Sequence, residues 1–244
     1  GYARHLKILP NSGENLLLRP AGAGAFTRKD FSGLKLTVVA PAQVDLDKLK
    51  ASWKKMLKKV KAQAVSYAEL ADYVDKTVNN LSSVVTLAEF GKKTMLLTGD
   101  ARGDSVIEGL KGAGLLSPGP LHVSLLKMPH HGSWRNMSGT FFEQVVADFY
   151  VFSADGKYDN PDEATIESLL DVRTDDKFTL VLTNDCNGRV AWIEKQRKAR
   201  GRHFKLAVRP DGKRSVVVYL GEALCGAAAR DSLARRPARR LARP

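Results

Sequence analysis

Three observations predict that this sequence folds as a mixed α/β (α+β) protein. Short apolar runs alternate with amphipathic segments over most of the chain, which is typical of a sheet covered by helices. Two apolar runs joined by a short turn, which indicate a hairpin, precede that alternation. The composition, with 43% hydrophobic and 27% charged residues, is that of a globular core. The length of 244 residues allows one large domain or two small ones.

The first part of the chain is expected to hold short strands and one helix. Apolar runs at 16–18 and 34–40 predict strands separated by Gly- and Pro-rich turns. Asp45 is a candidate N-cap for a helix over 46–60, in which apolar residues recur at helical spacing. The lysine pairs of that helix are interpreted as its solvated face, and a nucleic-acid-binding stripe is the less favoured alternative.

The central and later parts supply the hairpin and the α/β alternation. The runs at 83–90 and 94–98, with Gly91 between them, predict a hairpin whose second strand is buried. Further helices are expected over 104–111, 139–146, 162–170 and 194–200, and further strands over 123–128, 149–153, 179–183, 204–209 and 215–220.

The net charge of +13 lies almost wholly in the C-terminal quarter. Residues 189–244 hold 16 Lys/Arg and 4 Asp/Glu, a balance of +12, which leaves +1 for residues 1–188. Such a segment suits a polyanionic partner, nucleic acid above all, through phosphate contacts and counterion release. For the Ala/Arg-rich tail at 226–244, a solvated end is an equally good interpretation.

Cysteine content and hydropathy exclude several classes of protein. The two cysteines, Cys186 and Cys225, are too few for a disulfide scaffold or a CxxC zinc ribbon. No apolar run has the length of a membrane span, and no signal peptide is visible. We therefore expect a cytoplasmic protein with free thiols and no membrane span.

Polar side chains of the kinds that bind metals follow two apolar strands. Asp100 comes directly after the strand at 94–98, and His130 and His131 follow the strand at 123–128. Binding sites in layered folds collect at such strand ends, and carboxylates and imidazoles are ligands of Zn²⁺ and Mn²⁺. A Gly-Asp turn alone is more often a capped turn, and a His-His pair alone is more often a structural polar pair. Both together, each at the end of a strand, indicate a metal site more specifically.

The region 79–133 resembles the C-terminal half of a metallo-β-lactamase-fold domain. The most similar branch is the one found at the C-terminal end of DNA-uptake competence channel proteins. The shared pattern is a hairpin whose second strand ends in Thr-Gly-Asp (98–100), a helix, and a strand ending in Pro-His-His-Gly-Ser (129–133). The resemblance extends to about residue 170. It implies one four-layer αβ/βα sandwich domain over 1–225, with its motifs at 79–170 and a basic part at 189–225, followed by the tail at 226–244.

The resemblance also implies an activity. It implies hydrolysis by a metal-activated water with two Zn ions, or Mn, usually at a phosphodiester, and hence a nuclease acting on DNA or RNA. Asp100 is then the metal-bridging carboxylate, and His130 or His131 a metal ligand or a proton donor to the scissile phosphate. The residues expected to orient that loop or line the pocket are Ser133, Gly132, Ser83, Asn80 and Asn79.

The sequence departs from the family pattern in two places. The main metal motif, His-x-His-x-Asp-His, is absent, so the N-terminal metal-binding portion is expected to be missing from this chain. In a later loop, Asn160 stands where the family has a ligand histidine, and Asp159 is the candidate replacement as a metal ligand.

Three explanations of the missing motif stay open: a second polypeptide fragment that completes the site, a stretch missing from this sequence, or an inactive module that binds nucleic acid or protein. A small-molecule hydrolase of the same fold is a further alternative, because fold alone does not set the substrate.

Overall fold

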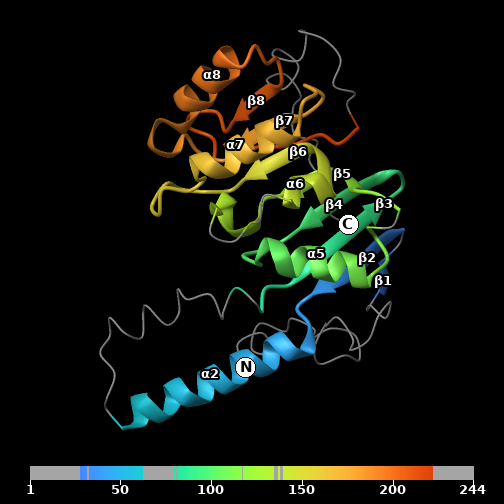
Figure 1. Ribbon diagram of the computed structural model, residues 1–244, viewed down its shortest axis with the longest axis vertical. Coiled ribbons are helices and arrows are strands. Elements are labelled where there is room, and N and C mark those ends of the chain that lie inside the picture. Colours follow the sequence, from blue (N-terminus) through green and yellow to red (C-terminus); the bar gives the residue numbers. More distant parts are fainter. Residues whose placement is uncertain are drawn as a thin grey trace, which may run out of the picture.

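The computed structural model describes residues 28–31, 33–62, 80, 82–116, 118–134, 137 and 140–221. These residues form one eight-stranded sheet in which the strands follow the order of the chain, from β1 to β8. Figure 1 shows β1 at one end of the sheet and β8 at the other, with helices packed along it. The predicted mixed α/β class is therefore confirmed. The strand predicted over 16–18 lies outside the described residues.

The first half of the sheet is antiparallel. Its strands are β1 (Arg28–Phe31), β2 (Leu34–Ala40), β3 (Val85–Phe90) and β4 (Lys93–Leu97). The predicted hairpin is the β3–β4 pair, in which Phe90 and Lys93 face one another beside the turn. Between β2 and β3 the predicted helix is present as α2 (Gln43–Lys61), which Figure 1 shows beyond the β1–β2 end of the sheet. Asp45 was wrongly predicted as its N-cap: the helix begins at Gln43, and Asp45 lies in the first turn, where its carboxylate accepts from the Ala42 N–H.

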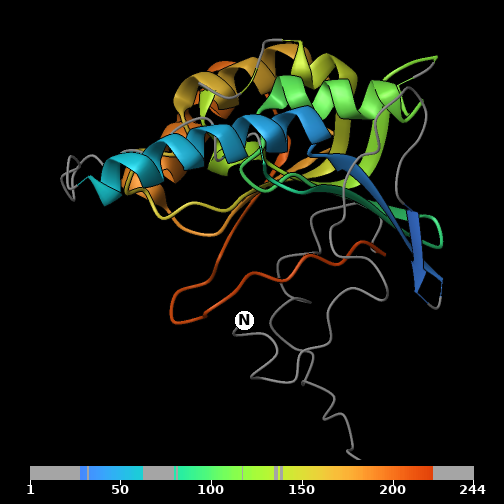
Figure 2. The same ribbon diagram turned by 90° about the horizontal axis from the view of Figure 1, so that it is seen from below.

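The second half of the sheet is parallel and alternates with helices. From β4 onward each strand runs parallel to the next. The elements are α5 (Gly103–Gly112), β5 (Leu121–Lys127), α6 (Phe141–Gln144), β6 (Val145–Phe152), α7 (Glu163–Val172), β7 (Thr179–Leu182), α8 (Arg189–Ala199) and β8 (Lys205–Val208). When each new parallel strand lies on the same side of the strand before it, right-handed crossover connections place all the connecting helices on one face of the sheet. Figure 2 shows these helices together on one side of the sheet.

The hydrophobic core lies between the sheet and these helices. One row of neighbouring residues crosses five strands on that face: Leu87, Leu96, Leu126, Tyr150 and Leu180. All five are at most 2% exposed. Close helix packing adds to the core, because a Cβ added at Gly109 of α5 would lie 2.2 Å from the Val39 carbonyl oxygen of β2.

The opposite face of the sheet is also apolar but less covered. Its central row pairs Leu36, Ala88, Met95, Leu125 and Phe149 across strands β2 to β6. On the same face Leu97 is 41% exposed and Phe90 is 62% exposed. Figure 2 shows the segment after β8 running on this side, away from the helices. Neither face of the sheet is polar throughout, so both faces suit packing.

Three of the elements predicted in the second half of the chain differ from the structure. The helix predicted over 139–146 is short, because Val145 and Val146 are β-branched residues that pair with β5 and begin β6. The strand predicted over 215–220 does not form, and Val217 is 58% exposed there. The helix predicted over 194–200 begins earlier, at Arg189, where the Asp185 carboxylate accepts a hydrogen bond from the Val190 N–H. Among the described helices, none has the length and apolar character of a membrane span.

Candidate functional site

The two motif-bearing strand ends lie side by side at the carboxyl edge of the parallel strands. β4 ends at Leu97 and β5 at Lys127, and these two residues are direct neighbours in the sheet. The Thr98 hydroxyl donates a 2.6 Å hydrogen bond to the Lys127 carbonyl and ties the two ends together. The turn that holds Asp100 therefore meets the loop that holds the two histidines, as the sequence predicted.

The histidine loop has an unusual backbone. His130, His131 and Gly132 have φ values of 42°, 59° and 88°, all in the left-handed region. Such a conformation costs roughly 1–2 kcal/mol for each residue with a Cβ. A Cβ at Gly132 would also lie 2.7 Å from Phe152 and 2.9 Å from Pro161, so only glycine fits. Strained backbone of this kind concentrates at functional sites.

Contacts from two other segments, the Gly99 turn and Asp162, hold this backbone in place. The His130 N–H donates to the Gly99 carbonyl at 3.2 Å. The Asp162 N–H donates to the Gly132 carbonyl at 3.2 Å, while the Asp162 carboxylate accepts the Trp134 N–H at 2.7 Å. Ser133, predicted to orient the loop, is buried, and its hydroxyl lies 3.5 Å from the same carboxylate.

His131 and Asp100 form the central pair of the site. His131 Nε2 lies 3.4 Å from Asp100 Oδ1, and both side chains are a little under half exposed. On its other side, His131 Nδ1 contacts the Ser153 carbonyl oxygen. A carbonyl only accepts hydrogen bonds, so Nδ1 carries a proton and Nε2 is the ring nitrogen that faces Asp100. In the neutral form of the ring, Nε2 presents a lone pair to the space beside the carboxylate.

His130 has the opposite arrangement of its ring nitrogens. Asn80 Nδ2 lies 3.2 Å from His130 Nδ1. An amide nitrogen only donates, so Nδ1 accepts and the neutral ring of His130 carries its proton on Nε2. The structure thus brings Asn80 to the site, as predicted, while Asn79 lies outside the described residues.

Ser83 also reaches this edge of the sheet, next to the Asp100 turn. A Cβ built on Gly99 would lie 3.4 Å from the Ser83 Cβ and 3.7 Å from its hydroxyl oxygen. Gly99 itself has a φ of 55°, which glycine adopts without the penalty of other residues. The predicted placement of Ser83 near the site is therefore consistent with the geometry.

Sequence reasoning missed Lys127, the last residue of β5. Its Nζ donates to the Gly99 carbonyl at 2.9 Å and lies 4.0 Å from Asp100 Oδ1. Burial lowers the pKa of Lys127, and the Asp100 charge partly offsets that effect. The available signal was a lone charge in an apolar strand directly before the histidine motif. Together with the His130 N–H, the ammonium fixes the Gly99 carbonyl and hence the turn that presents Asp100.

The structure does not bring Asp159 to this group. Its carboxylate accepts from Asn187 Nδ2 at 3.0 Å and lies 3.4 Å from Arg189. Asn160, at the position of the family's ligand histidine, is buried with 8% exposure. Within the described part of the chain, no three His, Cys, Asp or Glu side chains are grouped as a metal would require. Of the side chains predicted to bind a metal, the structure brings Asp100 and His131 together and places Asp159 elsewhere.

The comparisons with known proteins add no assignment. No protein-family model matches the chain, and the search of curated proteins finds no significant match.

Proposed function

We propose that this protein is a metal-dependent hydrolase of the metallo-β-lactamase type that cleaves phosphodiester bonds of DNA or RNA. The observation that carries the proposal is the Asp100–His131 pair, whose Oδ1 and Nε2 atoms lie 3.4 Å apart in a partly exposed position at a strand edge. The resemblance of the Thr-Gly-Asp and Pro-His-His-Gly-Ser motifs to that family supports the reaction type. The basic C-terminal quarter supports a polyanionic substrate.

The chemistry of this pair fits a zinc ion. Ligand atoms about 2.1 Å from a tetrahedral Zn²⁺ lie roughly 3.4 Å from each other, which is the observed separation of His131 Nε2 and Asp100 Oδ1. A hydrogen bond from the other ring nitrogen to a backbone carbonyl is the usual outer contact of a ligand histidine, and His131 has one to Ser153. A metal held here would polarise a phosphoryl oxygen and lower the pKa of a bound water.

The remaining residues of the site serve the substrate in this proposal. His130, with its proton on Nε2, donates a hydrogen bond or a proton to a phosphate oxygen beside Asp100. Lys127 and the Gly99 carbonyl keep the Asp100 carboxylate in position. The sequence left open which histidine has which role. In this proposal His131 is the metal ligand, and His130 is the proton donor to the phosphate.

We further propose that the sheet is half of a four-layer sandwich. The apolar row of Met95, Leu125 and Phe149 lies on the face that the described helices leave uncovered, and Leu97 of the same face is 41% exposed. A second sheet packed there, supplied by a second polypeptide, would bury this row and bring further metal ligands to the open side of Asp100. This explains how a two-ligand partial site becomes a complete one.

The experiment that tests the function is hydrolysis of end-labelled single-stranded DNA and RNA by the purified protein, together with every polypeptide that copurifies. We expect cleavage that EDTA abolishes and that added Zn²⁺ or Mn²⁺ restores. Cleavage that persists after metal removal would contradict a metal-dependent mechanism. No cleavage of either polymer at any metal concentration would contradict nuclease activity.

A second candidate function is an inactive module of the same fold that binds nucleic acid or protein. The observation in its favour is that Asp159 contacts Arg189 and Asn187 instead of the candidate metal site. Salt-dependent binding without bound metal or turnover is the result that this alternative predicts.

A further inference from the structure

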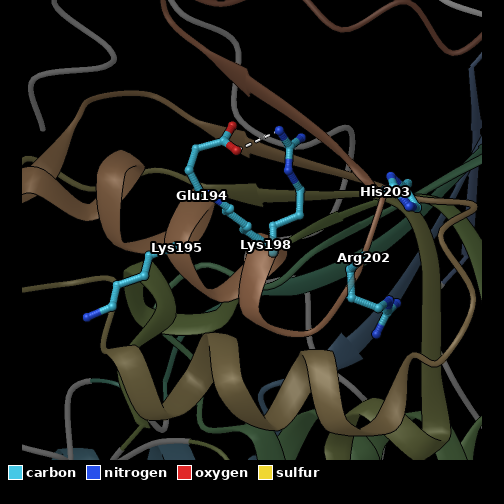
Figure 3. A pocket seen from close by; sticks show the side chains of 6 residues that line it. Glu194, Lys195, Lys198, Arg202 and His203 are labelled. Atoms are coloured by element: carbon cyan, nitrogen blue, oxygen red, sulfur yellow. Dashed lines mark ion pairs between the residues drawn. The ribbon is translucent and has the colours of Figure 1, made fainter.

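A second polar site lies at the far end of α8. Six residues line an open pocket of about 670 Å³ there: Glu194, Lys195, Arg197, Lys198, Arg202 and His203. Four are cations and one is a carboxylate, which gives a lining charge of +3 with the histidine neutral. Figure 3 shows these side chains coming from α8 and from the turn that follows it.

Two of the cations are fixed by the protein itself. Arg197 pairs with Glu194 at 2.5 Å and donates to the Phe204 carbonyl at 3.2 Å. Arg202 pairs with Asp176 at 2.7 Å and donates to the backbone carbonyls of three residues, Leu170, Arg173 and Asp175. Their guanidinium groups therefore form a rigid basic wall whose charge is partly neutralised.

The two lysines supply the positive charge that the pocket presents to a ligand. Lys195 and Lys198 are both exposed, and no carboxylate within the described residues pairs with either. Lys198 stands in the last turn of α8, where a cation also interacts favourably with the helix dipole. The helix dipole therefore accounts for Lys198 as a residue that stabilises the helix. It does not account for Lys195, which lies one turn earlier in α8.

This pocket is separate from the Asp100–His131 site. α8 begins at Arg189, which contacts the loop of Asp159 beyond the carboxyl end of β6. The helix then runs back for 11 residues, about 16 Å, to the edge where β8 begins at Lys205. The pocket therefore lies at the amino edge of the parallel strands, and the candidate catalytic residues lie at the carboxyl edge.

We propose that the α8 pocket is a docking site for the phosphodiester backbone of nucleic acid, at a distance from the point of cleavage. The class of partner rests on the proposed function. The lining contains no Phe, Tyr or Trp on which a base would stack, so the site contacts phosphates without reading sequence. Residues 189–244 carry a balance of +12 along the sequence, which favours the same class of partner.

The test is binding of a labelled 20-base-pair DNA duplex by the full protein in EDTA, in an Asp100→Asn background, so that no cleavage is needed. The variant is K195E/K198E, and its matched control is K92E/K93E, which makes the same charge change on exposed lysines beside the β3–β4 turn. We expect the α8 variant to bind at least tenfold more weakly and the control less than twofold. Each phosphate contact to B-DNA contributes about 0.9 to the slope of log K against log salt concentration. Loss of two contacts is therefore expected to reduce the magnitude of that slope by about 1.8.

Equal losses in the two variants would show a net-charge effect only, and unchanged affinity in the α8 variant would overturn the proposal. K195Q/K198Q, which adds no repulsion, is the second variant if the charge reversal unfolds the protein, and it must show the same fall in salt slope. Tight α8-dependent binding, with no cleavage by the unsubstituted protein in Zn²⁺ or Mn²⁺, would refute the proposed hydrolase and leave the pocket standing. Cleavage with α8-independent binding would refute the pocket alone.

Discussion

Replacing Asp100 with asparagine is expected to abolish phosphodiester cleavage while the protein stays folded. The amide keeps the size of the side chain but loses the negative charge that lies 4.0 Å from Lys127 and that would bind the metal. Loss of metal-based transition-state stabilisation of several kcal/mol corresponds to a fall in kcat/KM of about a thousandfold or more. The measurement is kcat/KM on the labelled oligonucleotide, with thermal unfolding recorded for both proteins.

Asp148→Asn is the matched control for this prediction. Asp148 of β6 is also partly exposed, and its carboxylate lies 3.2 Å from Nε2 of His122 on β5. Both residues lie outside the candidate site. We expect D148N to keep its activity within about threefold, in line with the small contribution of exposed ion pairs. An Asp100→Asn protein that cleaves as fast as D148N would remove Asp100 from the proposed machinery.

Replacing Gly132 with alanine is expected to give the largest loss of stability at the site. The new Cβ meets Phe152 at 2.7 Å and Pro161 at 2.9 Å, and the residue has a φ of 88°. Left-handed strain of about 1–2 kcal/mol and overpacking of about 1–3 kcal/mol add up to roughly 2–5 kcal/mol. The measurement is the free energy of unfolding from denaturant titration, and we expect cleavage to fall as the histidine loop shifts.

Gly119→Ala provides the comparison for Gly132→Ala. No atom lies within 4 Å of a Cβ built at Gly119, and its φ is outside the left-handed region. This change is expected to leave the free energy of unfolding within about 0.5 kcal/mol of the original value. Equal stability of the two variants would mean that the histidine loop does not need the tight backbone described for Gly132.

The features that the sequence predicted well depend on neighbouring residues. The hairpin of β3 and β4 follows from two apolar runs and a Gly-containing turn, all within the 13 residues from Val85 to Leu97. The meeting of Asp100 with His131 follows from one rule, that parallel strands end at the same edge. Both are consequences of local pattern and chain topology, which do not require side-chain geometry.

The features that the sequence could not supply depend on contacts between distant residues. Asp159 pairs with Arg189, 30 residues away, and no local signal shows that this carboxylate already has a partner. The hydrogen bonds that set the proton positions of His130 and His131 come from Asn80 and Ser153, far along the chain. Val145 and Val146 were assigned to a helix because their pairing with β5 is likewise a tertiary contact.

The central claim is that Asp100 and His131 bind a catalytic metal in a site that a second sheet completes. Its most direct test is metal content by elemental mass spectrometry on the purified protein, with the intact mass of every polypeptide present. We expect close to two equivalents of Zn or Mn per chain, together with a second polypeptide, and loss of metal in the Asp100→Asn protein. A single metal-free chain of 26.7 kDa that gains no metal on titration would contradict it and favour the inactive binding module.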